Sequence, residues 1–519
     1  MFLSVLKQYQ LPLAVFFTGG AVLVVEVVAT RILSPYFGNT IFTFSSVISV
    51  ILAALSVGYA IGGRLSDRYP SERLFAVIIA ASGLCIYVVY WLVVLVLPSA
   101  AYTLDVVSGP LIASLALFFL PACLLGLLSP FAITLQSRSF PQQGIGAVSG
   151  SIFFWSTAGS IVGSLGTGFF LIPHFGVSAI LMGIAGLLLI LGLSLFLAAG
   201  VRKAIIVGAV MACIGGVVSA PVEPVGLAVY SQDTQYQRVD VVDGLYDDQP
   251  TRFFLQDHAP SGAMFLDSNE FVLEIAKFTA LYQVLHPDIR QALIIGGGAY
   301  NIPKKLLNDI PDIQVDVAEI DPALLPIAQR YFGLKADSRL TNHIADGRRF
   351  LHDTSRTYDL IYSDVYYSLF LPPHLATAEF FLAAKEKLST DGLFLGNFIG
   401  ELSSDGTTSL LLSEMRTFQE VFPNSYFFLT DPALPTEAQN IVFLGYNSPQ
   451  SIDFQSVVFT EQADPLLRSL RAKRIDTASL HLARFPKMTD DYAPVEYLIG
   501  RLVASAPGAR PIQLPQAQQ

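Results

Sequence analysis

The chain has 519 residues, of which 53% are hydrophobic and 14% charged, and its formal net charge is −10. The negative charge and the lack of a basic stripe exclude binding of nucleic acid by phosphate neutralisation. Fewer than ten charged residues lie between residues 11 and 201. This segregation predicts a lipid-embedded half followed by a water-soluble half.

Apolar stretches of 18 or more residues are typical of transmembrane helices. We therefore predict a multi-pass α-helical transmembrane domain over residues 1–222, in a bacterial-type inner or plasma membrane. The first stretch is too long for a cleavable signal peptide, so we expect it to stay as an anchor. Seven stretches qualify: 12–34, 41–63, 74–98, 111–136, 146–172, 177–199 and 204–220.

Basic residues fall in alternate connections between these stretches, which by the positive-inside rule places the N-terminus and those connections in the cytoplasm. With seven spans the soluble half would lie outside. The side of the membrane is therefore left open, since the segment 204–220 is the shortest of the seven. The basic residues concerned are Lys7, Arg64, Arg68, Arg73, Arg138, Arg202 and Lys203.

Small residues recur within the spans at the spacing that lets helix backbones approach closely in lipid. The pairs are Gly58-xxx-Gly62 and Gly159-xxx-Gly163, and Gly166 and Gly168 follow. Glu26 and Arg31 lie in the first span, where an acid is costly and is a functional candidate. Glu26 has either a substrate or proton role or a structural polar contact.

The connection Gly63-Arg-Leu-Ser-Asp-Arg68 resembles the loop after the second helix of major facilitator transporters. The resemblance implies a transporter-like helical bundle. It does not imply transport, because only about half the usual number of spans is present.

The soluble half begins with a predicted linker at residues 221–230 and strand-like segments at 236–242 and 252–255, which predict a small antiparallel lid. Apolar strands then alternate with amphipathic helices. This alternation predicts a doubly wound, Rossmann-like α/β domain with a parallel sheet and a ligand at the carboxyl ends of its strands. The predicted strands are 291–296, 314–319, 340–345, 358–363 and 392–397, and the helices are 271–285, 302–309, 322–331 and 377–388.

The predicted domain boundaries follow from this pattern. Residues 223–290 hold the linker, the lid and an entry helix, and residues 291–505 form the Rossmann-like domain. The tail 506–519 is rich in Pro, Ala and Gln, a composition typical of disorder.

Glycines and acids follow successive predicted strands. Gly296-Gly297-Gly298 ends the first, where a backbone without side chains can approach a ligand. Glu319 ends the second and can accept both hydroxyls of a ribose. Asp346-Gly347 ends the third and can bind an adenine amino group, and Asp364 ends the fourth. Because these ends share one edge of a parallel sheet, they predict one cleft for a nucleotide-type ligand.

Four phrases carry a resemblance to the membrane-fused spermidine synthase (polyamine aminopropyltransferase) family, whose enzymes depend on S-adenosylmethionine derivatives. The resemblance implies that Gln237 and Asp267 face the cleft, and that Tyr300 and Asp321 join the cofactor-binding set. It assigns Asp364 to the reacting amine. The phrases are Ser261-Gly-Ala-Met-Phe-Leu-Asp267, Gly296-Gly-Gly-Ala-Tyr300, Val317-Ala-Glu-Ile-Asp-Pro322 and Thr489-Asp-Asp-Tyr-Ala-Pro-Val-Glu496.

The implied reaction transfers an aminopropyl group from decarboxylated S-adenosylmethionine to putrescine or a similar amine and releases methylthioadenosine. The amine arrives protonated, so a carboxylate must hold the cation and a base must take its proton. Asp364 is the candidate base. Tyr366 or Tyr367 either offers a ring face to the cation or packs the cleft. No metal is expected, since Cys85, Cys123 and Cys213 lie in predicted spans without metal-ligand spacing.

Further substrate-binding candidates lie beyond the Asp364 loop. His374 either contacts substrate or belongs to the entry of a helix. Asp490, Asp491 and Glu496 either close over a polyamine as an acidic clamp or form a solvated surface. A homodimer is expected by resemblance only.

The sequence departs from the family at two positions. Ala299 stands where the family glycine turn has an aspartate for the aminopropyl ammonium, and Tyr367 replaces an acid after the strand-end aspartate. Intact S-adenosylmethionine is then an alternative ligand, for methyl transfer or for cleavage to methylthioadenosine. A transport or sensing protein for polyamines or adenosyl ligands is a second alternative. Seven spans would place the soluble half outside the cell, which conflicts with supply of the donor from the cytosol.

Overall fold

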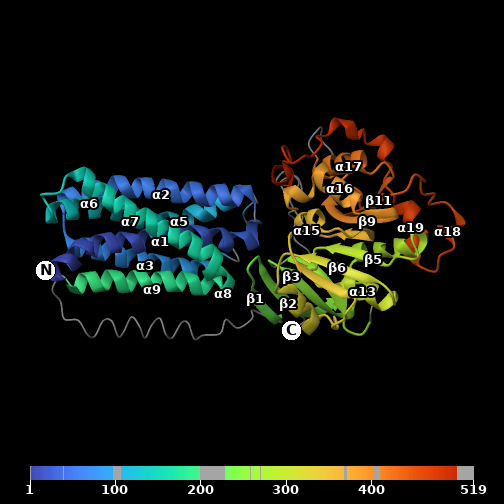
Figure 1. The fold of residues 1–519 in the computed structure, drawn as a ribbon, viewed down its shortest axis with the longest axis horizontal. Coiled ribbons are helices and arrows are strands. Elements are labelled where there is room, and N and C mark those ends of the chain that lie inside the picture. Colours follow the sequence, from blue (N-terminus) through green and yellow to red (C-terminus); the bar gives the residue numbers. More distant parts are fainter. Residues whose placement is uncertain are drawn as a thin grey trace. The chain divides into compact units, whose positions relative to one another are not determined.

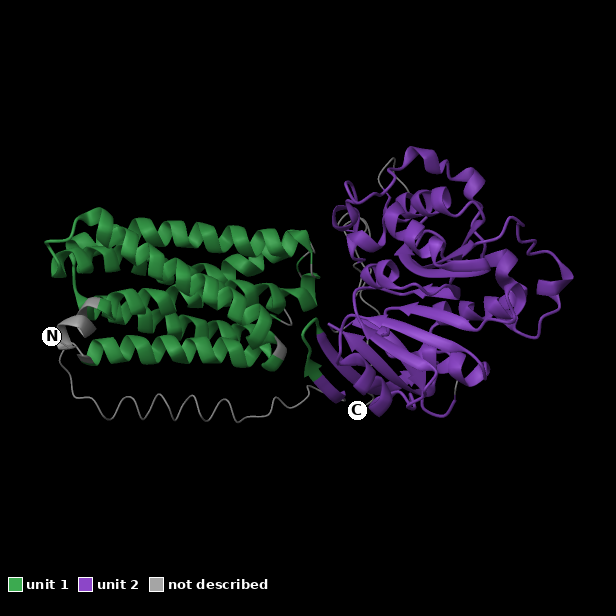
Figure 2. Ribbon diagram, viewed as in Figure 1, with its two compact units in different colours: residues 1–223, 232–237 green, residues 224–231, 238–519 purple. Residues whose placement is uncertain are grey.

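The computed structural model describes residues 2–38, 40–97, 104, 107–198, 228–257, 259–268, 270–366, 371–402 and 409–499. The chain divides into two compact units (Figure 2). The first comprises Met1–Glu223 and the turn Gln232–Gln237, and the second comprises Pro224–Ser231 and Arg238–Gln519.

Long apolar helices form the first unit and run alongside one another (Figure 1). In this bundle α1 packs against α7, α2 against α5 and α3 against α9. The elements are α1 (Phe2–Phe37), α2 (Ile41–Arg68), α3 (Glu72–Leu95), α5 (Gly109–Gly126), α6 (Leu128–Ser139), α7 (Ile145–Gly166), the π-helical turn η1 (Thr167–Leu171), α8 (Ile172–His174) and α9 (Val177–Ala198).

Six stretches among the described residues are long and apolar enough to cross a membrane. They overlap the first six predicted spans, and the predicted seventh, 204–220, lies outside the described residues. The six are Tyr9–Phe37, Ile41–Arg68, Glu72–Leu95, Gly109–Ser139, Ile145–Leu171 and Val177–Leu197.

Glycines set the distance between the packed helices. A Cβ atom at Gly58 or Gly62 would collide with the backbone of α5 or with Leu127, and one at Gly159 or Gly163 would collide with the backbone of α1. The predicted close approach is therefore confirmed for both pairs. It is wrong for Gly166 and Gly168, whose Cβ positions have no other atom within 4 Å.

Arg31 lies near the end of α1 and donates to backbone carbonyl oxygens of the turn Gln232–Gln237, which belongs to the same unit. Its guanidinium bonds the oxygens of Thr234, at 2.9 Å, and Tyr236. The Arg31 side chain is thus a hydrogen-bond donor to this turn. Glu26, on the same helix, is half-buried.

Four strands form a small sheet in the order β1-β2-β3-β4. They are β1 (Ala228–Asp233), β2 (Arg238–Tyr246), β3 (Gln249–Gln256) and β4 (Ala259–Phe265). The pairs β2–β3 and β3–β4 are antiparallel. Asp247 and Asp248 both have positive φ, as a two-residue type I′ hairpin requires. The predicted lid is present, but β1 begins inside the stretch predicted as linker.

The larger sheet has seven strands in the order β10-β11-β9-β8-β5-β6-β7. The strands are β5 (Gln291–Ile295), β6 (Gln314–Glu319), β7 (Leu340–Ile344), β8 (Tyr358–Ser363), β9 (Leu388–Gly400), β10 (Ser425–Leu429) and β11 (Gln439–Tyr446). From β9 to β7 all pairs are parallel, whereas β11 is antiparallel to both β9 and β10. The five predicted strands pair in parallel, which confirms the doubly wound α/β fold, and the two strands that were not predicted, β10 and β11, make the sheet mixed.

Helices and helical turns connect these strands (Figure 1). The predicted entry helix 271–285 is broken into three short pieces, α11 (Glu274–Lys277), η2 (Phe278–Leu281) and α12 (Tyr282–Leu285). The others are α13 (Asn301–Asp309), α14 (Leu324–Tyr331), α15 (Gly347–Asp353), η3 (Pro373–Leu375), α16 (Ala378–Glu386), α17 (Leu410–Val421), α18 (Val457–Thr460), α19 (Pro465–Lys473), η4 (Thr477–Ser479) and η5 (Leu482–Arg484).

Burial of the sheet explains its apolar strands. Ile294, Val317 and Leu360 are buried in one core cluster together with residues of α13 and α14. Phenylalanines of α16, α17, β9 and β11 pack against one another, and Phe398 and Phe443 stack with ring centroids 4.0 Å apart. Such packing on both faces fixes the strand ends that carry the acids.

We predict that Gly62→Ala destabilises the helical unit by about 1–3 kcal/mol, because the added methyl group meets the Leu127 backbone. Gly63→Ala is the matched control, since its Cβ meets nothing within 4 Å. Thermal unfolding of detergent-purified protein measures both. Equal shifts of Tm in the two variants would contradict the packing described here.

Candidate active site

The glycine turn after β5 lies directly against the segment after β8. Gly296 has φ of 88°, and a Cβ atom there would collide with the carbonyl oxygen of Asp364. The Asp364 amide in turn donates to the Ile295 oxygen at 2.9 Å. Only glycine combines this conformation with this approach. The glycine turn and the strand-end aspartate are therefore in direct contact.

Glu319 connects the end of β6 to the same turn. Its carboxylate accepts hydrogen bonds from the Gly297 amide at 2.7 Å and from the Asp321 amide at 2.8 Å. Burial raises the pKa of Glu319, and these backbone hydrogen bonds oppose the rise. The Gly298 amide also bonds this carboxylate, and its acceptance of ribose hydroxyls stays a prediction.

Tyr300 and Asp321 support the turn from within the protein. The Tyr300 side chain is fully buried, and its hydroxyl donates to Asn342 Oδ1 at 2.6 Å. Asp321 is buried and accepts from the Ala323 amide at 3.0 Å, where it closes the turn before α14. The Tyr300 ring lies against Gly297, where a Cβ atom would be 2.6 Å from it, and a contact of Tyr300 with the cofactor stays a prediction.

Asp346 caps α15 and pairs with His374. Its carboxylate accepts from the Arg349 amide at 3.0 Å and from His374 Nε2 at 2.9 Å. The His374 hydrogen bond is the largest cause of a lowered pKa of Asp346, and burial opposes it. Gly347 is required beside it, because a Cβ there would collide with Ile295. His374, in the helical turn η3 before α16, thus bonds the proposed adenine acid, and its contact with substrate stays a prediction.

Asp364 directly follows β8 and lies in a polar group with Asn397. Its Oδ1 accepts from Asn397 Nδ2 at 3.0 Å. Burial raises the pKa of Asp364, opposed by this hydrogen bond. The Tyr366 hydroxyl accepts from the Ile399 amide at 3.0 Å, and its ring meets Phe398 edge-on. Tyr367 lies outside the described residues.

Sequence reasoning missed two polar side chains of this group, Asn397 and Glu414. Glu414 is fully buried on α17, and neither of its oxygens has a hydrogen-bond partner among the described residues. Burial raises the pKa of Glu414 well above its ordinary value, and burial together with the nearby Glu414 raises the pKa of Tyr366. The available signal was an acid within the apolar run Leu410-Leu-Leu-Ser-Glu-Met415.

The residues in and next to the lid differ in how closely they approach the glycine turn after β5. A Cβ at Gly262 of β4 would lie 2.9 Å from the Ala299 Cβ, so β4 packs directly on the position where the family has an aspartate. Asp267 follows β4 and is exposed. Gln237 belongs to the turn Gln232–Gln237 of the helical unit, and its backbone amide donates to Thr234 Oγ1. Its cleft role stays a prediction.

The three acids of the predicted clamp differ in their surroundings. Asp490 is bound by Arg348 through two contacts of 2.6 Å. Asp491 is exposed, and Glu496 is half-buried. The predicted clamp is therefore wrong for Asp490, whose charge already has a cationic partner.

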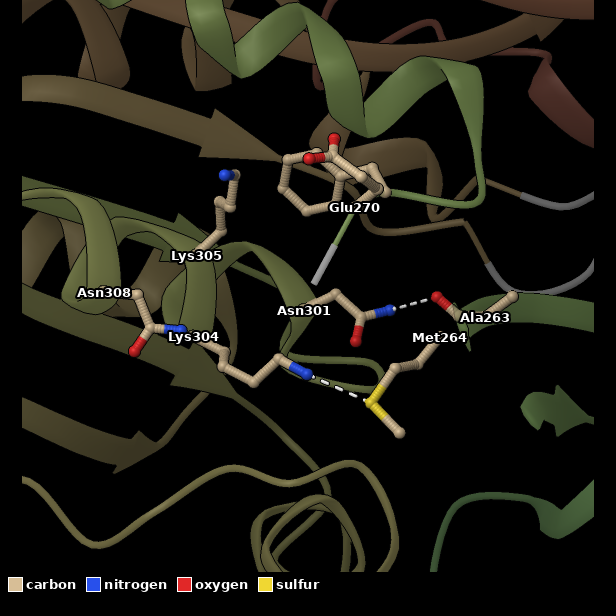
Figure 3. Close-up of a pocket in the computed structure, with 8 residues that line it drawn as sticks. Ala263, Met264, Glu270, Asn301, Lys304, Lys305 and Asn308 are labelled. Atoms are coloured by element: carbon tan, nitrogen blue, oxygen red, sulfur yellow. Dashed lines mark hydrogen bonds between the residues drawn. The ribbon is translucent and has the colours of Figure 1, made fainter. Parts of the chain in front are cut away.

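A pocket lies between β4 and α13 (Figure 3). Lys304 donates there to Met264 Sδ at 3.0 Å and, outside the view, to the Phe332 oxygen at 2.9 Å. Asn301 donates to the Ala263 oxygen. The acids of the strand ends do not line this pocket. Among the described residues no group of three or more His, Cys, Asp and Glu could hold a metal ion.

We predict that Glu414→Gln stabilises the protein increasingly as pH rises. A raised folded-state pKa means that the native state binds the proton more tightly, so wild-type stability is highest below the unfolded pKa and falls as pH rises towards the folded one. The loss is about 1.4 kcal/mol per pH unit in that window. Unfolding midpoints of both proteins at pH 5 and pH 8 measure the difference.

Glu420→Gln on the same helix is the control for this comparison. Glu420 pairs with Lys487 and Arg416, which lower its pKa, so its removal does not stabilise the protein at pH 8. A difference between Glu414→Gln and wild type that is the same at both pH values would refute the assignment.

The comparisons with known proteins concern the second unit. Residues 276–456 match the spermine/spermidine synthase domain family. The polyamine aminopropyltransferase of Vibrio vulnificus is 30% identical over 164 residues, which are 31% of this chain and 52% of that protein. The polyamine aminopropyltransferase of Streptococcus uberis is 28% identical over 44% of this chain and 79% of that protein.

A solved structure described as a probable spermidine synthase from Corynebacterium glutamicum covers 51% of this chain and 97% of its own, with 17% identity and a TM-score of 0.43. The chain spans about half the length of the first curated relative that it matches. The strand order, the glycine turn and the matched residues agree on one conclusion. Residues 276–456, within the C-terminal half of this chain, are similar to the spermine/spermidine synthase domain.

Proposed function

We propose that the C-terminal half transfers an aminopropyl group from decarboxylated S-adenosylmethionine to putrescine or a similar amine. The observation that carries this proposal is the contact of the Gly296 turn with Asp364, beside Glu319. The names of the curated relatives support aminopropyl transfer over a reaction on the intact donor. Because Ala299 stands where the family has an aspartate, analysis of the products decides which donor is used.

The donor is proposed to lie across the strand ends. The backbone of the glycine turn approaches it, Glu319 accepts from its ribose hydroxyls, and Asp346 accepts from its adenine amino group. The lowered pKa keeps Asp346 ionised as an acceptor. No metal takes part in this proposal.

The amine is proposed to lie beside Asp364. The amine nitrogen forms a bond to the aminopropyl carbon while the carbon–sulfur bond breaks. The electron pair of the carbon–sulfur bond stays on the sulfur of methylthioadenosine. The proton that the amine loses goes to the Asp364 carboxylate. A pKa raised by burial makes this carboxylate a better base than an exposed aspartate. Tyr366 is proposed to wall the amine site.

The first unit is proposed to anchor the enzyme as a multi-pass membrane protein, because six of its helices have the length and hydropathy to cross a bilayer. Pairing through the soluble half is kept as a proposal by resemblance. The relatives favour an enzyme over the transport or sensing alternative.

We predict that Asp364→Asn lowers kcat by about 10²- to 10⁴-fold, because the amide cannot take the proton. Binding of methylthioadenosine, measured by calorimetry, stays within about threefold of wild type, a difference under 1 kcal/mol. In wild type, kcat rises with pH through the Asp364 pKa, and the variant lacks this rise.

Asp353→Asn, at an exposed acid that caps no strand end, is the control and keeps wild-type kinetics. Wild-type turnover by Asp364→Asn would remove this residue as the base.

A further inference from the structure

Hydrogen bonds and an ion pair connect the C-terminal segment to the Asp346 carboxylate. Arg348 of α15 donates from Nη1 to Asp490 Oδ1 and from Nη2 to Asp490 Oδ2, both at 2.6 Å. The same Nη1 also donates to the backbone oxygen of His374 at 3.2 Å. One guanidinium therefore holds the C-terminal acid and the residue that bonds Asp346.

His374 passes this connection to the proposed adenine acid. Its Nε2 lies 2.9 Å from Asp346 Oδ2, while Asp346 Oδ1 accepts from the Arg349 amide. The Asp346 carboxylate is thus held on one side by the backbone of α15 and on the other by the imidazole. Its orientation depends on where η3 places that imidazole.

The C-terminal segment is also fixed to the start of α16. Thr377 Oγ1 donates to Asp490 Oδ1 at 3.0 Å, and the Asp490 amide donates to Glu379 Oε2 at 3.1 Å. The Ala378 amide donates to the Met488 oxygen at 3.0 Å. Asp490 therefore has a defined position from which it can orient Arg348.

The exposure of this ion pair limits what it contributes to stability. The side chains of Arg348 and Asp490 are 27% and 46% exposed, and pairs of this kind stabilise a fold little. A two-pronged guanidinium–carboxylate pair does fix geometry. Its removal is expected to affect orientation more than folding.

We propose that Asp490 is a positioning residue for the donor: through Arg348 and His374 it orients Asp346 toward the adenine amino group. The inference rests on the proposed function and deepens it. The segment around Asp490 then serves the donor and not the polyamine.

The test compares full-length Asp490→Asn with wild type in detergent. The KM for the donor is expected to rise about tenfold, the effect of one lost charge-assisted hydrogen bond, while the KM for the amine stays within twofold. Asp353→Asn is the matched control: its carboxylate is also 46% exposed and also pairs with an arginine, so both KM values are expected to stay unchanged.

A second arm asks whether Asp490 acts through His374. His374→Ala alone is expected to raise the donor KM, and Asp490→Asn added to it is expected to raise it no further. In the swapped pair, Arg348→Asp with Asp490→Arg, the donor KM is expected to lie between that of Asp490→Asn and that of wild type. Should Asp490→Asn fail to fold, Arg348→Lys carries the same expectation, because lysine keeps the charge and loses the fork.

Three results would overturn the inference: a rise in the amine KM alone, equal rises in both KM values, or additive effects of Asp490→Asn and His374→Ala. Failure of the proposed function is separate. If wild type forms no methylthioadenosine, calorimetry with methylthioadenosine replaces kinetics, and an unchanged affinity in Asp490→Asn, or no binding to wild type, overturns the inference.

Discussion

The approach of Gly296 to the backbone of Asp364 is the constraint on which the rest of the site depends. Strand β5 pairs in parallel with β6 and β8, so Ile295 lies level with Ala318 and Ser363. The three strands therefore end together, and a side chain at Gly296 would force two of them apart. Glu319 reaches the same turn because its strand ends one residue past that level.

The three strand-end acids differ in environment although they share one edge of the sheet. Burial raises the pKa of Glu319 and Asp364, whereas His374 and a helix N-terminus lower that of Asp346. An acceptor for an amino group benefits from staying ionised, and a base benefits from a raised pKa. The environments therefore match the roles proposed for Asp346 and Asp364.

The amino-acid pattern predicted most of the sheet, because strands buried on both faces are recognisable as short apolar runs. It could not predict β11, whose reversed direction depends on pairing with β9. It also placed Asp490 with the amine, because an ion pair with a residue 142 positions away leaves no local signal. Glu414 was missed for a related reason, since a helix pattern does not show which acid faces the core.

The same limit applies to the helices. The spacing of Gly58 and Gly62 predicted their contact, but Gly166 and Gly168 share the composition and meet nothing. Spacing gives the face of a helix, whereas contact depends on which neighbour that face meets. Tyr300 has a left-handed backbone and a buried ring that lies against Gly297, and the sequence pattern shows neither feature.

The most direct measurement is mass spectrometry of the products formed by the detergent-purified chain from putrescine, with decarboxylated or intact S-adenosylmethionine in parallel. The proposed function predicts methylthioadenosine and an amine longer by one aminopropyl group with the decarboxylated donor alone. Products from the intact donor alone, whether methylthioadenosine without a longer amine or S-adenosylhomocysteine, would contradict it.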